Sequence, residues 1–431
     1  MTDTIFALSS GSPPSAIAVM RISGPAAQQV LDRLAGVVPE PQRLSLRTLR
    51  DAAGEVLDRA LVAFFPAASS VTGEDLVELH LHGGRAVVAA VERTLGAMPG
   101  VRAARAGEFT WRAFENGRMD LVQVEALSDL LRAETEGQRR AALAGNRLSA
   151  QVEGWRQQIL MLSALVEAAL DQSDEDDVPV EDGRIAALAA ALDADMAALR
   201  ARPEAERLHD GIRVVFAGPP NAGKSSLINA LAGRDVAITS PVAGTTRDVI
   251  EAPVRIGGVA FVLTDTAGLR AEAGDAIERI GIERARERLR GADILVWLDD
   301  AEPDPETVGE DGPDAVILVH ARADMAGRET LPAGRLAVSA MTGEGLGALA
   351  DRLVATARTL LPVEGEAALN RRQRALVAEC HELIVAFRGE PDELIRAELL
   401  RRCRQALDAL TGRAGTEDML DALFSTFCVG K

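Results

Sequence analysis

Alternating hydrophobic patterns fill the first part of the chain, and helical patterns follow. Within residues 1–118, apolar and polar positions alternate over Leu76–His82, and turn-forming residues gather at Ser9–Pro14 and Gly83–Gly84. Alternation with a period of two is typical of a strand with one buried face, so this part predicts a compact α+β domain. From about Met119 the spacing becomes helical. One apolar stripe on a long predicted helix consists of Val152, Trp155, Ile159, Leu162, Val166 and Ala169.

A strand, a glycine-rich loop and a helix are predicted from Ile212, and α/β alternation continues to about Leu361. Helical spacing returns after Pro362. The leucines of this last part that we expect to be buried are Leu394, Leu399, Leu407 and Leu410. The pattern therefore predicts an N-terminal α+β domain (1–118), two helical parts (119–210 and 362–431) and an inserted α/β domain (211–361). The helical parts flank the insertion, so we expect them to form one discontinuous domain.

Composition excludes several classes of protein. With 431 residues, 47% of them hydrophobic, the chain is long enough for several hydrophobic cores. The most apolar run, Ile159–Leu170, is short and contains Glu167, so we expect no membrane span. The N-terminus carries Asp3 and no basic residue before Arg21, which argues against a secretory signal, and three cysteines cannot form a disulfide framework. These features predict a cytoplasmic protein.

The charge distribution adds two observations. A net charge of −18 disfavours a globally basic nucleic-acid binder. Of 47 basic residues only Lys224 and Lys431 are lysines. A chain that favours arginine this strongly is expected to keep lysine where a compact ammonium group is required, although chance survival is the alternative.

A phosphate-binding loop is the strongest motif. The strand Arg213–Ala217 leads into Gly218-Pro-Pro-Asn-Ala-Gly-Lys-Ser225, and an apolar helix start follows. This string has the required strand-to-helix context, in which backbone N–H groups cradle phosphates, Lys224 bridges the β and γ oxygens, and Ser225 binds Mg²⁺. The loop residues predicted to bind nucleotide are Asn221, Ala222, Gly223, Lys224, Ser225 and Ser226.

Further elements of a GTPase follow in order. Thr246 can bind Mg²⁺ and sense the γ-phosphate, and Asp265 can hold the shell of the metal at the end of the strand Phe261–Thr264. Two loops are placed to flank a base: 321–324 and 339–343. The additional predicted nucleotide-binding residues are Ser240, Thr245, Thr246, Asp265, Thr266, Ala267, Gly268, Asp324, Ser339 and Ala340.

The base loop and the catalytic apparatus depart from common GTPases. The usual Asn-Lys-x-Asp carries Ala321 and Arg322 in its first two positions, and Asp324 remains to accept from guanine N1–H and N2–H. Leu269 stands where Ras-like enzymes have a water-positioning glutamine. Glu278 is the nearest candidate to orient the water, with a solvated helix charge as the alternative, and Arg247 is a further catalytic candidate. A monovalent cation near Asn221 could supply the charge of an arginine finger.

With these motifs the chain resembles, over essentially its whole length, the MnmE (TrmE) family of bacterial GTPases that modify tRNA uridines. The segments that carry the resemblance beyond the GTPase motifs are Asp3–Ile5, Arg21–Pro25, Gly73–Asp75, Glu78–Gly84, Gly107–Thr110, Asn116–Leu121 and Phe427–Lys431. The resemblance implies a P-loop GTPase domain inserted into a helical domain. It also implies modification of C5 of the wobble uridine of certain tRNAs, giving aminomethyl or carboxymethylaminomethyl groups, together with an MnmG-type flavoprotein.

The resemblance also implies cofactors and site residues. A 5-formyl- or methylene-tetrahydrofolate supplies the one-carbon unit, in a site that matches Arg21, Glu78, Arg118 and Lys431. K⁺ binding maps to Asn221, Ser240, Val242 and Thr245, and Mg²⁺ binding to Ser225 and Thr246. Glu278 matches the catalytic glutamate, and Cys428 a functionally important cysteine. The family forms homodimers through the N-terminal domain, with transient pairing of GTPase domains.

Several alternatives stay open. A regulatory or assembly GTPase would need neither the folate residues nor Cys428, and an NTPase with relaxed base choice would follow from Ala321. His80 and His82 could form a metal pair beside Glu78, but without a third clear ligand a structural role is favoured. We expect Cys380 and Cys403 to be core residues. The acidic segment Asp299–Asp314 predicts a solvent-exposed loop rather than a metal site.

Overall fold

The computed structural model describes most of the chain. The described residues are 3–171, 182–234, 251–265, 289, 291–303, 312–363, 365–414, 423–425, 427 and 429–430. They fall into two compact units. The first unit is drawn from 1–128, 149–156 and 404–431, and the second from 129–148 and 157–403.

A six-stranded sheet forms the centre of the first unit, in the order β3-β4-β5-β2-β1-β6. Its strands are β1 (Thr4–Leu8), β2 (Ile17–Ser23), β3 (Ser45–Arg50), β4 (Val56–Phe65), β5 (Leu76–His82) and β6 (Val101–Ala103). The neighbours are antiparallel except β1 and β6, which are parallel. The alternation over Leu76–His82 therefore predicted β5 with the bounds that the structure has.

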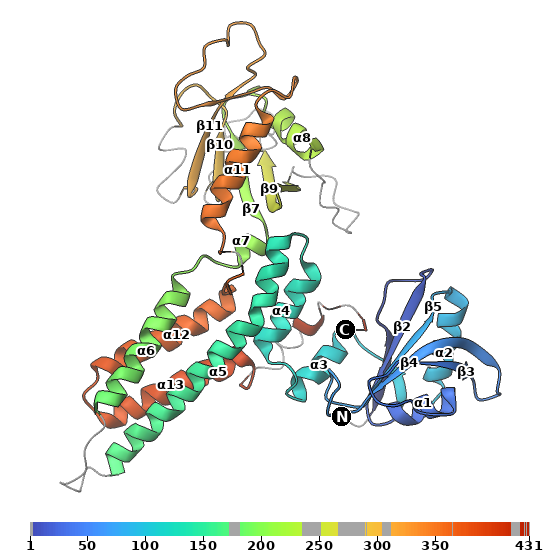
Figure 1. Cartoon of the computed structure of the whole chain (residues 1–431). Coiled ribbons are helices and arrows are strands. Elements are labelled where there is room, and N and C mark those ends of the chain that lie inside the picture. The colour runs from blue at the N-terminus through green and yellow to red at the C-terminus, as the bar shows by residue number, and fades with distance from the viewer. Residues whose placement is uncertain are drawn as a thin grey trace, which may run out of the picture. The chain divides into compact units, whose positions relative to one another are not determined.

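Helices α1 (Ala27–Ala35) and α2 (Arg85–Gly96) cover one face of this sheet (Figure 1). Their apolar residues and alternate strand residues share one core, because successive strand side chains point to opposite faces. The opposite face carries the intervening residues, among them Arg21 on β2 and Glu78 on β5, which stand directly opposite each other in the register. The side chains that carry polar chemistry thus lie on the face opposite α1 and α2. We call this the open face; Phe109 packs against it at Ile5 and Ala7.

The last described residues of the chain pack onto the first unit. α3 (Glu108–Glu115) and α4 (Leu121–Arg132) supply Trp111, Phe114 and Leu121 to an apolar cluster that also contains Phe424 and Phe427. The Trp111 and Phe424 rings meet edge to face with centroids 4.9 Å apart. Burial of these aromatic rings anchors the C-terminal segment beside α3.

A second six-stranded sheet lies in the second unit, in the order β12-β11-β10-β7-β9-β8. Its strands are β7 (Ile212–Ala217), β8 (Glu251–Ile256), β9 (Val259–Asp265), β10 (Ile294–Trp297), β11 (Ala315–Ala321) and β12 (Leu336–Val338). All neighbours are parallel except the β8–β9 pair. α8 (Lys224–Arg234) and α11 (Leu346–Leu360) share one core with this sheet. The carboxyl ends of the parallel strands, where α/β proteins bind ligands, are the ends that carry the predicted nucleotide motifs.

The remaining helices are α5 (Glu136–Asp171), α6 (Asp182–Arg200), α7 (Glu206–His209), α12 (Arg371–Gly389) and α13 (Glu393–Thr411). The predicted stripe lies on α5, where Val152, Trp155, Ile159, Leu162 and Val166 are buried. On α12 and α13, Cys380 and Cys403 are fully buried, as predicted, and each thiol faces the other's backbone carbonyl.

The expectation for Leu394 was wrong, because its residue is 69% exposed. Leu399 is half-buried, and Leu400 is buried in its place. Leu394 and Leu399 are five positions apart, which turns them about 140° from each other on a helix of 3.6 residues per turn. The buried face instead follows Leu400, Cys403, Leu407 and Leu410 at three- and four-residue steps. None of the helices that the structure describes is long and apolar enough to cross a membrane.

Candidate nucleotide site and N-terminal polar site

The phosphate loop connects β7 to α8. Gly218 has φ +143, and a Cβ there would lie 2.8 Å from the carbonyl oxygen of Leu298, so only glycine fits. The Lys224 residue is 6% exposed, and its Nζ donates to the carbonyls of Gly218 (3.0 Å) and Pro219 (2.9 Å). The ammonium group is thereby held inside the loop, where phosphate oxygens would replace the carbonyls as acceptors.

The predicted metal-binding pair is assembled from two elements. Ser225 is the exposed second residue of α8, and its Oγ donates to Oδ2 of Asp265 at the end of β9. Asp265 is fully buried. A hydroxyl and a carboxylate that converge in this way are oxygen donors of the kind that Mg²⁺ prefers, so the pair fits a nucleotide-bound magnesium ion.

A cavity of about 340 Å³ lies beside the phosphate loop. Its lining includes Gly223 and Ser226 on one side and Arg322, Asp324 and Ala340 on another. Among the lining side chains, Asp324 supplies the carboxylate, and the Ala321 methyl group lies where an asparagine amide is usual. The cavity therefore brings together the phosphate loop and both predicted base loops.

Ser339 holds the second base loop in shape. It is fully buried, and its Oγ accepts from the N–H groups of Met341 (3.2 Å) and Thr342 (3.1 Å). The N–H of Ala323 in the first base loop donates to the carbonyl of Val338. The two loops are thus connected through the end of β12, which places Ala340 in the same cavity as Asp324.

Several predicted residues lie outside the described part of the chain. These are Ser240, Val242, Thr245, Thr246, Arg247, Thr266, Ala267, Gly268, Glu278, Cys428 and Lys431. Their roles stay predictions. Of the predicted K⁺ ligands, Asn221 is described: it is exposed in the phosphate loop with φ +61.

Arg21 and Glu78 form an ion pair on the open face of the first sheet. Arg21 Nε donates to Glu78 Oε1 at 2.9 Å, and His80 Nε2 lies 3.3 Å from Glu78 Oε2. His82 bonds instead to Asp58, with Nδ1 2.7 Å from Oδ1. Burial raises the pKa of Asp58, but hydrogen bonds from His82 and from the Arg59 N–H outweigh it, so the pKa is lowered. The two histidines therefore have separate carboxylate partners.

The other folate candidates lie around this pair in different ways. Exposed Arg118 donates through Nη2 to the carbonyl of Ala67 at 2.6 Å, in the loop before β5. Lys431 is outside the described residues, but its neighbour Gly430 is bonded to Ser9, whose Oγ donates to the Gly430 carbonyl at 2.8 Å. A Cβ at Gly430 would lie 2.4 Å from the Leu8 carbonyl oxygen. Since Leu8 ends β1, next to β2, Gly430 lies close to the strand that carries Arg21.

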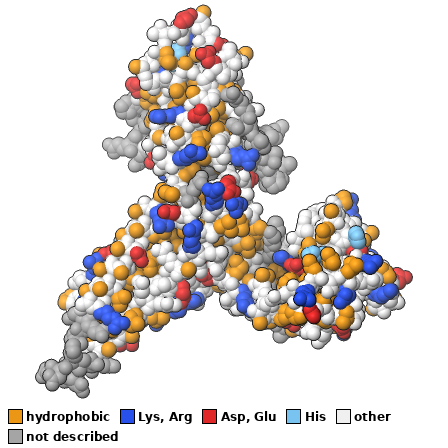
Figure 2. All heavy atoms as spheres, in the orientation of Figure 1, with side chains coloured by type: hydrophobic (Ala, Val, Ile, Leu, Met, Phe, Trp, Pro, Cys, Tyr) orange, Lys and Arg blue, Asp and Glu red, His pale blue; other side chains and the backbone are white. Residues whose placement is uncertain are grey.

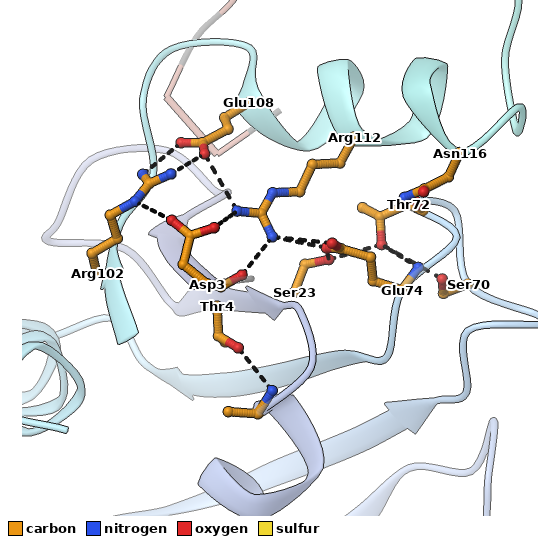
Figure 3. Close-up of polar contacts among 11 residues, drawn as sticks. Asp3, Thr4, Ser23, Ser70, Thr72, Glu74, Arg102, Glu108, Arg112 and Asn116 are labelled. Carbon is orange, nitrogen blue, oxygen red and sulfur yellow. Dashed lines mark hydrogen bonds and ion pairs between the residues drawn. The ribbon is translucent and has the colours of Figure 1, made fainter. Parts of the chain in front are cut away.

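A buried arginine that the sequence analysis missed joins α3 to the start of the sheet. Arg112 is fully buried, and its guanidinium donates to Asp3 Oδ1 (2.9 Å), to the Asp3 carbonyl (2.9 Å) and to Glu74 Oε2 (2.9 Å) (Figure 3). Ser23 Oγ donates to the same Glu74 oxygen at 2.9 Å. Glu74 belongs to a segment that carries the family resemblance, and the structure explains it as the anchor of the loop before β5.

Arg102 extends this network. It donates to Asp3 Oδ2 at 2.6 Å and contacts Glu108 with two nitrogens (Figure 3). Burial raises the pKa of Asp3, but the hydrogen bond and charge of Arg102 and the charge of Arg112 outweigh it, so the net shift is downward. The pKa of Glu108 is lowered in the same way, against burial, by Arg102 and by the Arg105 N–H. Both carboxylates are therefore stabilised in their charged form.

Comparison with known proteins shows a similarity that covers nearly the whole sequence. A family model described as the N-terminus of the GTP-binding protein TrmE matches residues 4–118, and one described as the MnmE helical domain matches residues 121–428. A protein of Erythrobacter litoralis named tRNA modification GTPase MnmE is 56% identical over 439 residues, which cover 100% of both chains. Proteins of the same name from Rhizorhabdus wittichii (54% over 435 residues, 100% of this chain and 97% of the other) and Novosphingobium aromaticivorans (52% over 445 residues, 100% of both) are similar as well.

Proposed function

The chain belongs to the MnmE family of tRNA modification GTPases, and we propose that it is a potassium-activated GTPase that acts in the modification of wobble uridine. In this proposal it adds an aminomethyl or carboxymethylaminomethyl group to C5 together with an MnmG-type flavoprotein. The observation that carries the GTPase activity is one cavity edged by the phosphate loop and by Asp324, next to the Ser225–Asp265 pair.

Each described residue has a physical role in hydrolysis. Lys224 neutralises charge on the β and γ phosphates, which the buried ammonium group does without reorganising in water. Ser225, Asp265 and Thr246 would hold Mg²⁺, which would supply positive charge to the phosphates. The two loops around the base keep Asp324 at guanine N1–H and N2–H, the donors that adenine lacks. Glu278 is proposed to orient the attacking water because of its place in the segment after Gly268 and because of the resemblance. Arg247 is proposed as a further catalytic residue.

Potassium, when bound, supplies the positive charge that an arginine finger supplies in other GTPases. The residues that would hold it are Asn221, through its side chain, and Ser240, Val242 and Thr245. Asn221 fits this role because it is an exposed residue of the phosphate loop, so its side chain is accessible to an ion. Developing charge on the transferred phosphate is then neutralised when two GTPase domains meet, which makes activity depend on their transient pairing.

The open face of the first sheet is the proposed folate site. A carboxylate such as Glu78 can accept from two adjacent N–H groups of a pterin, and Arg21 can donate to its ring acceptors. Arg118 and Lys431 complete the proposed set, with 5-formyl- or methylene-tetrahydrofolate as the one-carbon source. The seating of Gly430 beside β1 supports a contribution from the chain terminus, and Cys428 belongs to the same segment.

Dimerisation through the N-terminal domain is part of the proposal. Leu46 on β3 and Leu61 on β4 are paired across the strands and are 48% and 41% exposed. Leu61 is opposite His80 in turn, so these leucines continue the face that carries Glu78. A pair of exposed leucines beside a polar site supports a homodimer whose interface borders the folate site.

The flavoprotein and tRNA are the proposed further partners, in the cytoplasm. On the face shown in Figure 2, Lys and Arg side chains are interspersed with acidic ones on both units. With a net charge of −18, this distribution supports a complex in which the flavoprotein contributes much of the basic surface for tRNA.

The experiment that tests the proposal is hydrolysis of GTP and ATP by the full chain in potassium and in sodium buffer, over a range of protein concentrations. We expect turnover selective for GTP, raised at least about tenfold by potassium and rising with protein concentration. Asn221→Ala should lose the stimulation and keep its GDP affinity within about threefold.

The matched control is Asp351→Asn, an exposed substitution on α11 that should behave as the wild type. Hydrolysis that is indifferent to the cation would contradict the Asn221 assignment. Equal use of ATP would support the NTPase with relaxed base choice.

A further inference from the structure

A polar cluster around one buried histidine adjoins the loop that carries Asp324. His320, next to the end of β11, is 2% exposed. One ring nitrogen, Nδ1, lies 2.6 Å from Asp300 Oδ1, and the other, Nε2, lies 2.9 Å from the carbonyl oxygen of Arg328. Arg328 Nη2 contacts both oxygens of Asp300 at 3.1 Å. We call His320, Asp300 and Arg328 the bracket.

Two residues of the bracket, His320 and Arg328, flank the base loop and are bonded to each other. His320 immediately precedes Ala321, and Arg328 follows Asp324 by four positions. Between them the turn is continued by Met325 N–H to the Arg322 carbonyl (3.0 Å) and Arg328 N–H to the Met325 carbonyl (3.1 Å). The bond from the His320 ring to the Arg328 carbonyl therefore fixes the span within which Asp324 is presented.

Asp300 anchors the bracket to the rest of the domain. Its backbone carbonyl accepts from Arg335 Nη2 at 2.9 Å, and the side chain of Arg335 is 3% exposed. Burial raises the pKa of Asp300, but the His320 hydrogen bond and the charges of Arg328 and Arg335 outweigh it, so the pKa is lowered. Asp300 is exposed, as expected for the acidic segment Asp299–Asp314, and it still contributes one structural carboxylate. Residues 304–311 of that segment lie outside the described residues.

On the side that faces the cavity, the same loop lacks the side-chain hydrogen bonds that an asparagine at position 321 would make. Ala321 presents only a methyl group to the cavity, so no side-chain amide there can bond to the neighbouring loops. Arg322 has φ +56 and lies across the phosphate loop, with Cγ 3.8 Å from the point where a Cβ of Gly223 would stand. From this contrast we infer that the bracket positions Asp324 for guanine selection, in place of the asparagine that the base loop lacks.

The inference rests on the proposed GTPase function and goes beyond it, because it assigns guanine selectivity partly to residues that touch no nucleotide. These are positioning residues. If they act through Asp324, their loss lowers the affinity for guanine nucleotides and leaves unchanged the affinity for nucleotides whose base does not bond to Asp324. If they only stabilise the domain, their loss affects both kinds of nucleotide equally.

The test measures affinity of the full chain for GDP and ADP with Mg²⁺ by calorimetric titration. His320→Leu removes the ring's contacts with Asp300 and Arg328. It should weaken the affinity for GDP about tenfold, while the affinity for ADP changes less than about twofold. Asp300→Asn, which keeps the shape of the side chain, is the second variant in case His320→Leu does not fold. Arg352→Gln, exposed on α11, is the matched control and should leave both affinities unchanged.

A second background makes the test specific. Ala321→Asn restores the asparagine side chain that the base loop lacks. In this background the same His320→Leu change should lower the GDP affinity less than about threefold. An unchanged ratio of GDP to ADP affinity in the bracket variants, or an equal loss in both backgrounds, would overturn the inference. A wild-type chain that does not distinguish GDP from ADP would instead contradict the proposed function itself.

Discussion

At the scale of single residues, Glu78 is the side chain whose surroundings bear most directly on function. It accepts from Arg21 with one oxygen and approaches His80 with the other, on the open face of the sheet. A carboxylate that contacts two basic partners and is still accessible can exchange one of them for the N–H groups of a ligand. This is the property that separates the proposed folate enzyme from a pure GTPase switch.

Glu78→Gln should therefore weaken binding of 5-formyl-tetrahydrofolate about tenfold or more, because an amide accepts fewer hydrogen bonds and carries no charge. Titration of the folate into the full chain, followed by calorimetry, measures the effect. GTP turnover should stay within about twofold of the wild type. Glu92→Gln, an exposed change on α2, is the control.

Undiminished folate binding in Glu78→Gln would show that the assignment of Glu78 is wrong. A wild-type chain that binds no folate would favour the regulatory or assembly GTPase.

Single residues also show where sequence-based prediction ends. Lys224, Ser225 and Asp265 were predictable because each belongs to a short local motif at the end of a strand. In the structure Ser225, next to Lys224 in the phosphate loop, bonds to Asp265. His320, Asp300 and Arg112 were not, because their partners are distant in the sequence: Arg112 and Asp3 are 109 positions apart. No local spacing encodes such a pair, and a buried arginine in an amphipathic helix has the same sequence pattern as an exposed one.

At the scale of elements, β1, β6 and α3 are held together by charge. Asp3 precedes β1, Arg102 lies on β6 and Glu108 begins α3, and the pKa values of both carboxyl groups are lowered. Groups with lowered pKa contribute stability above their ordinary values of 3.8 and 4.5. That stability is lost as the pH falls through the lower values of the folded state, since the unfolded chain then binds more protons.

Arg102→Gln should accordingly flatten the loss of stability in acid. We expect the free energy of unfolding of the wild type to fall from about pH 4.5 downward, and the variant to start lower and fall less steeply. Urea denaturation measures both profiles, followed by the fluorescence of Trp111, on α3, in a background where Trp155 and Trp297 are changed to Phe. Arg93→Gln, exposed on α2, should retain the wild-type slope. Identical slopes for Arg102→Gln and the wild type would contradict the assigned network.

Elements were predicted well where their periodicity is simple. β5 and the stripe of α5 follow directly from alternation and from three- and four-residue spacing. The error at Leu394 arose where the spacing of leucines alone was used without the helical angle between them. The covering of one sheet face by α1 and α2 could not be predicted, because a buried strand pattern does not show which helix packs on it.

At the scale of the whole molecule, two units share continuous helices. α5 contributes residues 149–156 to the first unit and all its other residues to the second, and α13 is divided after residue 403. Nucleotide is expected to bind only in the second unit, which contains the phosphate loop and Trp297, whereas Trp111 and Trp155 belong to the first.

Denaturation should thus show two transitions when the tryptophans are observed separately. In a chain with Trp111 and Trp155 both changed to Phe, Mg²⁺–GDP at about 100 times its Kd should stabilise the Trp297 transition by about 2.7 kcal/mol. In a Trp297→Phe chain the same addition should leave the midpoint unchanged. Equal shifts of both signals would mean that the units unfold as one cooperative body.

The two lysines of the sequence give the phosphate loop an unusual chemical property. Lys224 is the lysine among the described residues, and its amine is held between the carbonyls of Gly218 and Pro219. Reagents that acylate amines find few competing side chains in a protein whose remaining basic groups are guanidinium, apart from Lys431. The acylation rate of Lys224 should therefore report how often its amine leaves its carbonyl acceptors. Bound nucleotide should lower that rate.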